Sequence, residues 1–68
     1  MRIQFDLYLS DNGARRVRDA LMDAADRAEL RAQSEPYPED ALLLQLCGDL
    51  DLIAGHIARA IDEAKEAA

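Results

Sequence analysis

The first nine residues alternate between polar and apolar side chains, the pattern that most constrains how this chain can fold. The apolar positions are Ile3, Phe5, Leu7 and Leu9, and they interleave with Arg2, Gln4, Asp6 and Tyr8. A period of two predicts a β-strand over residues 2–9 with one buried face. Everything after Ser10 has helical spacing, and a lone strand leaves its backbone N–H and C=O groups unpaired. We therefore expect the strand to pair with the same strand of a second copy, in a homodimer.

The length of the chain also favours association. Sixty-eight residues make a single domain, 1–68, and a domain of about this size buries only about 60% of the surface that its unfolded chain exposes. Small domains commonly gain stability from disulfides, metals or oligomerisation. Cys47 is the only cysteine, which excludes an internal disulfide, and no cluster of ligand-type side chains predicts a metal or a cofactor. Oligomerisation remains, in agreement with the unpaired strand.

The charge balance is acidic. Fourteen acidic and eight basic residues give a formal net charge of −6, which disfavours nucleic acid and anionic membranes as partners. Seven arginines to one lysine, with thirteen alanines, suit a high-GC genome, such as that of an actinobacterium, its phage or a haloarchaeon. Residues 1–9 form no apolar block, and the longest apolar run, 41–44, is too short to span a membrane. We expect a cytoplasmic protein with no signal peptide and no small-molecule ligand.

A first helix is predicted over about residues 11–33. Ser10 is suited to cap its N-terminus, and Asp11 complements the helix dipole in the first turn. Small or apolar side chains then recur at steps of three and four, which predicts one buried side of an amphipathic helix. These side chains are Ala14, Val17, Leu21, Ala24 and Ala28.

A second helix is predicted over about residues 38–66, after a break at Pro36 and Pro38. Its apolar side is stronger and keeps a regular heptad spacing, with Cys47, Ala54 and Ile61 widening it. The positions are Leu43, Leu46, Leu50, Ile53, Ile57, Ala60 and Ala64. Because the connection is short, the two helices should lie antiparallel as a hairpin. The expected fold class is therefore mostly α, in the order β-α-α.

Two glycines interrupt the second helix. Gly48 and Gly55 each cost about 1 kcal/mol relative to alanine in a helix interior. One interpretation is a continuous helix whose small residues admit another backbone. The other is a break at Gly48, with Asp49 capping a new helix.

Three leucines of the second helix lie outside its main apolar side: Leu42, Leu44 and Leu52. One antiparallel helix cannot cover so wide an apolar surface, so the surplus predicts either a dimer contact or a binding site for a foreign protein. We expect the site to be rimmed by Asp49, Asp51 and Arg59.

The candidate catalytic side chains lack partners. His56 is the only histidine, and neither a serine nor a cysteine joins it to form a nucleophile and base. Cys47 lies among leucines, as a buried thiol does. Asp49 and Asp51 point in different directions on a helix, while Asp62 and Glu66 are better explained as surface charges than as a metal site. We therefore expect no enzyme.

The one basic cluster, Arg15, Arg16 and Arg18, is explained by exposed charge pairs such as Arg15–Asp19 and Asp23–Arg27. The alternative is contact with phosphate. A strand followed by two helices, with the strand forming a ribbon across a dimer, resembles the ribbon-helix-helix family of transcription regulators and antitoxins. That resemblance implies that Arg2, Gln4 and Asp6 face the major groove and that the second helix N-terminus holds a phosphate.

The preferred interpretation is a homodimer with a two-stranded ribbon against four helices. Its expected function is protein–protein recognition, as a small regulatory or inhibitory accessory protein of phage or bacterial origin. The ribbon-helix-helix regulator is the alternative.

Overall fold

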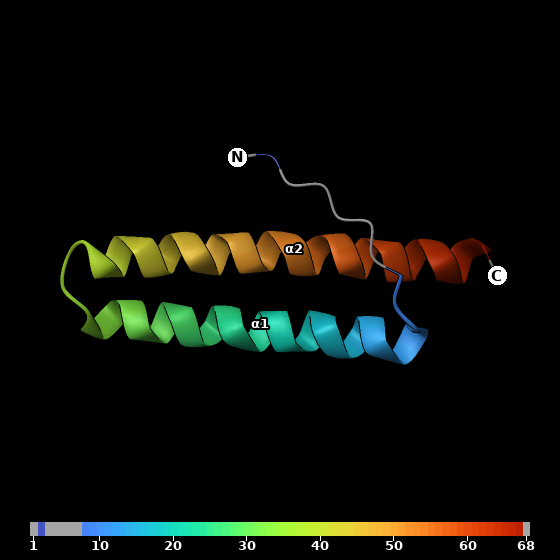
Figure 1. Ribbon diagram of the computed structural model, residues 1–68, viewed down its shortest axis with the longest axis horizontal. Helices are drawn as coiled ribbons and strands as arrows, with labels where there is room; N and C mark the ends of the chain where they lie inside the picture. Colours follow the sequence, from blue (N-terminus) through green and yellow to red (C-terminus); the bar gives the residue numbers. More distant parts are fainter. Residues whose placement is uncertain (1, 3–7, 68) are drawn as a thin grey trace.

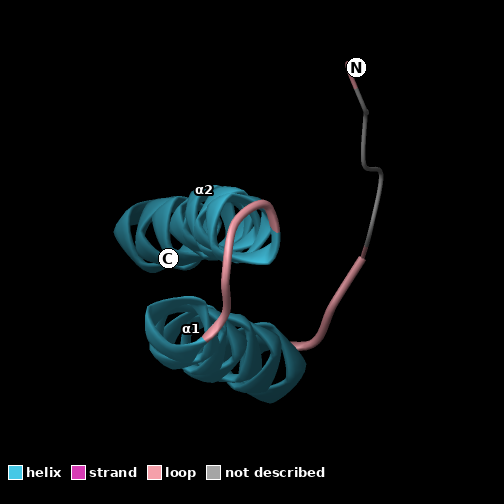
Figure 2. Cartoon of the chain, turned by 90° about the vertical axis from the view of Figure 1, so that its left-hand side faces the viewer, coloured by secondary structure: helices cyan, strands magenta, loops and turns pink. Residues whose placement is uncertain are grey.

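A computed structural model of the chain describes residue 2 and residues 8–67, without the side chain of Ala67. It contains two helices, α1 (Asp11–Ser34) and α2 (Glu39–Ala67), which lie side by side and antiparallel (Figure 1). The helical hairpin is therefore confirmed. The predicted strand lies largely outside the described residues, because these omit residues 3–7, and the described residues 8–10 form no strand. Figure 2 shows residues 8–10 as a loop that extends from the start of α1 along one side of the two-helix layer.

The start of α1 is fixed by the predicted cap. The hydroxyl oxygen of Ser10 accepts a hydrogen bond from the backbone N–H of Gly13 at 3.1 Å, and its carbonyl accepts one from Ala14 at 2.8 Å. A Cβ added at Gly13 would lie only 2.8 Å from the Ser10 hydroxyl oxygen. Glycine thus leaves room for the cap, and the helix begins at Asp11 as expected.

The turn between the helices is short and contains both prolines. The carbonyl of Pro36 accepts a hydrogen bond from Asp40 at 3.3 Å, and that of Pro38 accepts one from Leu42 at 3.1 Å. Glu39 and Asp40 occupy the first turn of α2, as predicted. The helix then continues through Gly48 and Gly55 without interruption, so the alternative of a break at Gly48 is wrong. That its small residues admit another backbone stays a prediction.

The core between the helices is made almost entirely of alanine. The buried apolar residues among those described are Ala25, Ala28, Ala32, Ala54 and Ile61. Ala28, Ala54 and Ile61 are buried on the predicted apolar sides, and most of the other predicted positions are half-buried. The prediction is wrong at Val17 of α1 and at Leu46, Ala60 and Ala64 of α2, which are exposed. Alanines fill the centre of the contact, larger side chains such as Leu21 and Leu50 are half-buried beside them, and others such as Leu46 are exposed.

A single layer of two helices cannot form a compact body. The radius of gyration is 14.2 Å, whereas a compact domain of this length has about 11 Å. The accessible surface is 5831 Å², against about 4,200 Å² for a compact protein of this mass. The hairpin therefore presents two broad sides, each built from both helices.

Candidate functional site

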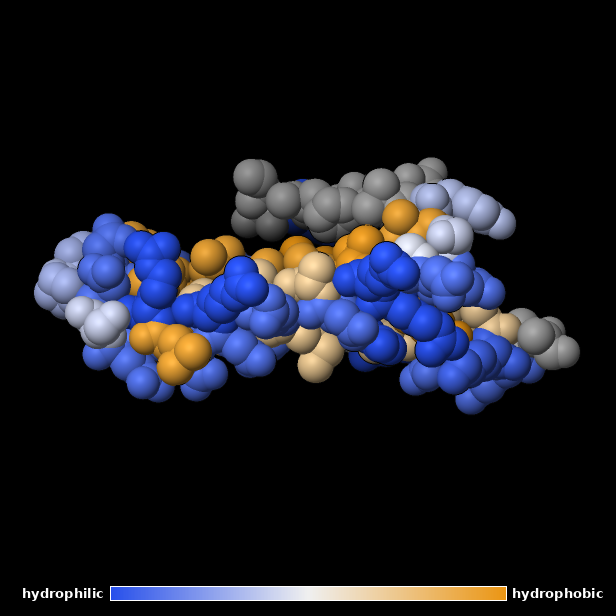
Figure 3. All heavy atoms as spheres, turned by 90° about the horizontal axis from the view of Figure 1, so that it is seen from below, coloured by the Kyte–Doolittle hydropathy of each residue, from blue (hydrophilic) through white to orange (hydrophobic). Residues whose placement is uncertain are grey.

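One broad side of the hairpin, called here the apolar face, carries apolar side chains from both helices, and the charged residues Asp23, Arg27 and Arg31 of α1 lie among them. Because successive residues of a helix turn by about 100°, these side chains share one flank of α1 and the neighbouring flank of α2. The face consists of Val17, Ala20, Ala24, Leu42, Leu46 and Ala60. Figure 3 shows hydrophobic side chains gathered along the upper edge of the molecule, where the chain enters α1, with a mostly hydrophilic surface below.

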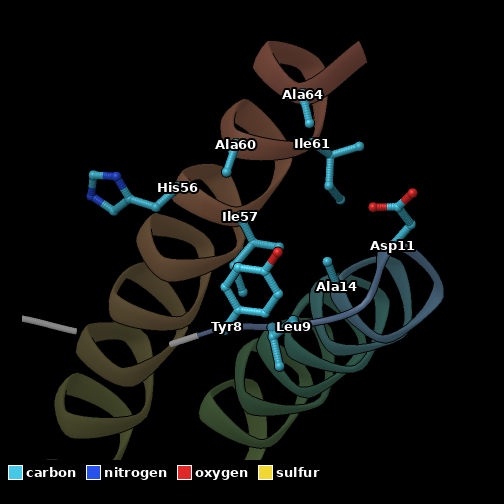
Figure 4. A pocket seen from close by; sticks show the side chains of 9 residues that line it. All are labelled: Tyr8, Leu9, Asp11, Ala14, His56, Ile57, Ala60, Ile61 and Ala64. Carbon is cyan, nitrogen blue, oxygen red and sulfur yellow. The ribbon is translucent and has the colours of Figure 1, made fainter. Parts of the chain in front are cut away.

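Two shallow grooves run along the apolar face. The first, of about 340 Å³, lies where Leu9 crosses toward α2 and is lined by Ala14, Ile57 and Ala64. Figure 4 shows Ile57 and Ile61 projecting from α2 toward α1 and the imidazole of His56 pointing away. The second groove, of about 460 Å³, lies nearer the turn. Its walls are Ala20, Asp23, Ala24, Arg27, Ala28, Arg31, Leu43 and Leu46.

The opposite broad side, called here the acidic face, surrounds Cys47. Partial burial raises the pKa of the Cys47 thiol, and the nearby carboxylates of Asp51, Glu29 and Asp26 raise it further. Because Glu29 and Asp26 belong to α1 and Asp51 to α2, the two helices together concentrate negative charge there. Leu44 lies exposed on the same flank of α2 as Asp51.

The three surplus leucines are all exposed, but the structure does not bring them together. Leu42, Leu44 and Leu52 expose 55%, 53% and 63% of their surface. Helical geometry places Leu42 about 160° from Leu44, with Leu52 between them on the side of α2 that is far from α1. Leu42 therefore belongs to the apolar face, Leu44 to the acidic face and Leu52 to neither.

The charged residues expected to rim the partner site are exposed and equally dispersed. Asp51 belongs to the acidic face, while Asp49 and Arg59 lie toward the outer side of α2. A single site that joins these residues to the three leucines would have to wrap around α2. The sequence thus identified exposed residues correctly but grouped them wrongly.

Two ion pairs form along α1, of which one was predicted and one was not. Arg27 contacts Asp23 at 2.9 Å, as predicted for residues four apart. Asp19 instead pairs with Arg18, at 3.1 Å from both the Nε and an Nη nitrogen of that guanidinium. Because these pairs are largely solvent-exposed, they add little stability and mainly orient the side chains.

The structure brings no catalytic constellation together among the described residues. His56 is exposed and has no hydrogen-bond or ion-pair partner there. A raised thiol pKa at Cys47 decreases the thiolate fraction, the opposite of nucleophile activation. No three metal-ligating side chains of the described residues lie close enough to hold an ion.

The positions implied by the ribbon-helix-helix resemblance are only partly described. Arg2 is exposed, whereas Gln4 and Asp6 lie outside the described residues, as do Ile3, Phe5 and Leu7 of the predicted dimer strand. At the N-terminus of α2, where that family holds a phosphate, the side chains present are Glu39 and Asp40. Two carboxylates there oppose the favourable field of the helix end.

One helix is long and apolar enough to cross a membrane. Residues Glu39–Glu66 of α2 reach a mean hydropathy of 1.4 over eighteen residues. This is weak evidence, because core helices of soluble proteins pass the same test. Asp49 and Asp51 also lie near the middle of α2, and each aspartate at a bilayer centre costs about 2.5–3.5 kcal/mol.

Sequence reasoning missed the apolar face because it assigned Leu46 and Ala60 to the contact between the helices. The signal that could have revealed it is the size of the side chains in α1. A row of alanines covers only a narrow stripe of the facing helix, so part of the leucine-rich side of α2 had to remain outside. Comparison of the chain with protein-family models, with curated proteins and with solved structures found no match.

Proposed function

We propose that this chain is a small acidic homodimeric protein–protein interaction module, a regulatory or inhibitory accessory protein of bacterial or phage origin that acts by surface contact. The observation that carries the proposal is the set of large apolar side chains exposed along α2, among them Leu42, Leu44, Leu46 and Leu52. Of these, Leu42 and Leu46 share the apolar face, and soluble monomers rarely expose contiguous apolar patches of more than a few hundred Å².

The amount of exposed surface supports more than one contact. The chain exposes about 1,600 Å² more than a compact protein of its mass, whereas a standard interface covers about 800 Å² on each partner. A homodimer therefore uses part of the excess and leaves room for a foreign protein. In the proposed dimer the strand at residues 2–9 pairs with its copy and places Phe5 on the buried side.

The composition of the exposed surface favours a protein over a nucleic acid as the partner. The formal net charge is −6, and the first turn of α2 is acidic where a phosphate would have to be held. Among the described residues, Cys47 and His56 lack the neighbours that activate a catalytic thiol or base. Contact, rather than chemistry, is what these side chains support.

Sedimentation equilibrium of the pure protein at micromolar concentration tests the homodimer, for which twice the 7.5 kDa chain mass is expected. A folded monomer would contradict it. The ribbon-helix-helix alternative predicts a gel shift with duplex DNA that is lost on Arg2→Ala or Gln4→Ala. We expect no shift at physiological salt, and nanomolar binding abolished by either substitution would favour the regulator instead.

A further inference from the structure

We draw no further inference here: the strongest candidate, the shallow groove of the apolar face near the turn, is lined by alanines and leucines together with Asp23, Arg27 and Arg31, and nothing in the structure shows what covers it.

Discussion

The two faces of the hairpin differ in character although the same two helices build both. On the apolar face, alanines of α1 lie beside leucines of α2, and Asp23, Arg27 and Arg31 line the same groove. On the acidic face, Leu44 shares its surroundings with Asp51, and carboxylates from both helices converge on Cys47. Leu44 and Leu46 are almost equally exposed. The difference between them therefore lies in their neighbours, and exposure alone does not indicate what a leucine binds.

The largest effect is expected from Phe5→Asp, which tests whether the strand at residues 2–9 joins the proposed dimer. If the strand pairs across the dimer, the substitution puts an unpaired charge on its buried side and should dissociate or unfold the protein, at a cost of several kcal/mol. Sedimentation and circular dichroism measure the two effects separately. A variant that remains a stable dimer would leave the helices as the only contact.

A smaller effect is expected where a foreign protein binds. Apolar anchors commonly contribute about 2 kcal/mol or more to an interface, whereas charges at the rim mainly change the association rate. Leu44→Ala and Leu52→Ala should weaken partner binding by about that amount, and Asp51→Ala by less. Calorimetry with the partner, once it has been isolated, measures the difference.

The dimer itself is the control for that comparison. Leu44→Ala and Leu52→Ala should leave the sedimentation of the pure protein unchanged, since the proposed dimer contact is the strand at residues 2–9. If they instead lower dimer affinity and thermal stability together, these leucines form the dimer contact, and the partner site lies elsewhere.

The hairpin was predictable from the sequence because its signals are local. Ser10 and Asp11 fix the start of α1, and the prolines fix the turn. What the periodicity could not give was the rotation of each helix about its own axis. Val17 and Ala24 matched a helical repeat as well as Ala25 and Ala32 do, and only packing decides between them. Alanine allows the closer approach, so the alanine rows became the core.

The grouping of the candidate site failed for the same physical reason. We grouped Leu42, Leu44 and Leu52 because all three lie outside the predicted apolar side of the second helix. Residues outside one side of a helix can still lie on different surfaces. In the structure, Leu46 and Ala60 are exposed and lie on the same flank of α2 as Leu42, whereas Leu44 lies near the carboxylates. The partner of an exposed face is a property of two molecules, and a single sequence carries no direct signal for it.

The glycines of α2 give a third, more modest effect. A Cβ added at Gly48 or Gly55 would meet no atom within 4 Å, so alanine fits at both positions and removes the backbone-entropy cost of glycine. Each Gly→Ala substitution should stabilise the protein by up to about 1 kcal/mol in thermal or urea denaturation. Gly13→Ala is the contrast, because its Cβ would crowd the Ser10 hydroxyl and weaken the cap.

These glycines also sharpen the comparison of the faces, since both lie on the same flank of α2 as Leu44. If Gly48→Ala raises stability but weakens the binding of a partner, the partner's backbone approaches that flank closely. Equal affinity before and after the substitution would instead place the partner elsewhere.

The smallest effect concerns the electrostatics of the acidic face and can be measured on Cys47. Alkylation by iodoacetamide proceeds through the thiolate, and both partial burial and the nearby carboxylates raise the thiol pKa. At a pH below that pKa the thiolate fraction is small, so Asp51→Asn should lower the pKa and speed alkylation by a few-fold. The gain should shrink as the pH rises above the pKa and as added salt screens the carboxylate. Asp49→Asn makes the same change in charge two positions away, on a flank that points elsewhere, and should have much less effect. If both substitutions speed alkylation equally, the thiol responds to the net charge of the chain, and the acidic face does not differ locally from the rest of the surface.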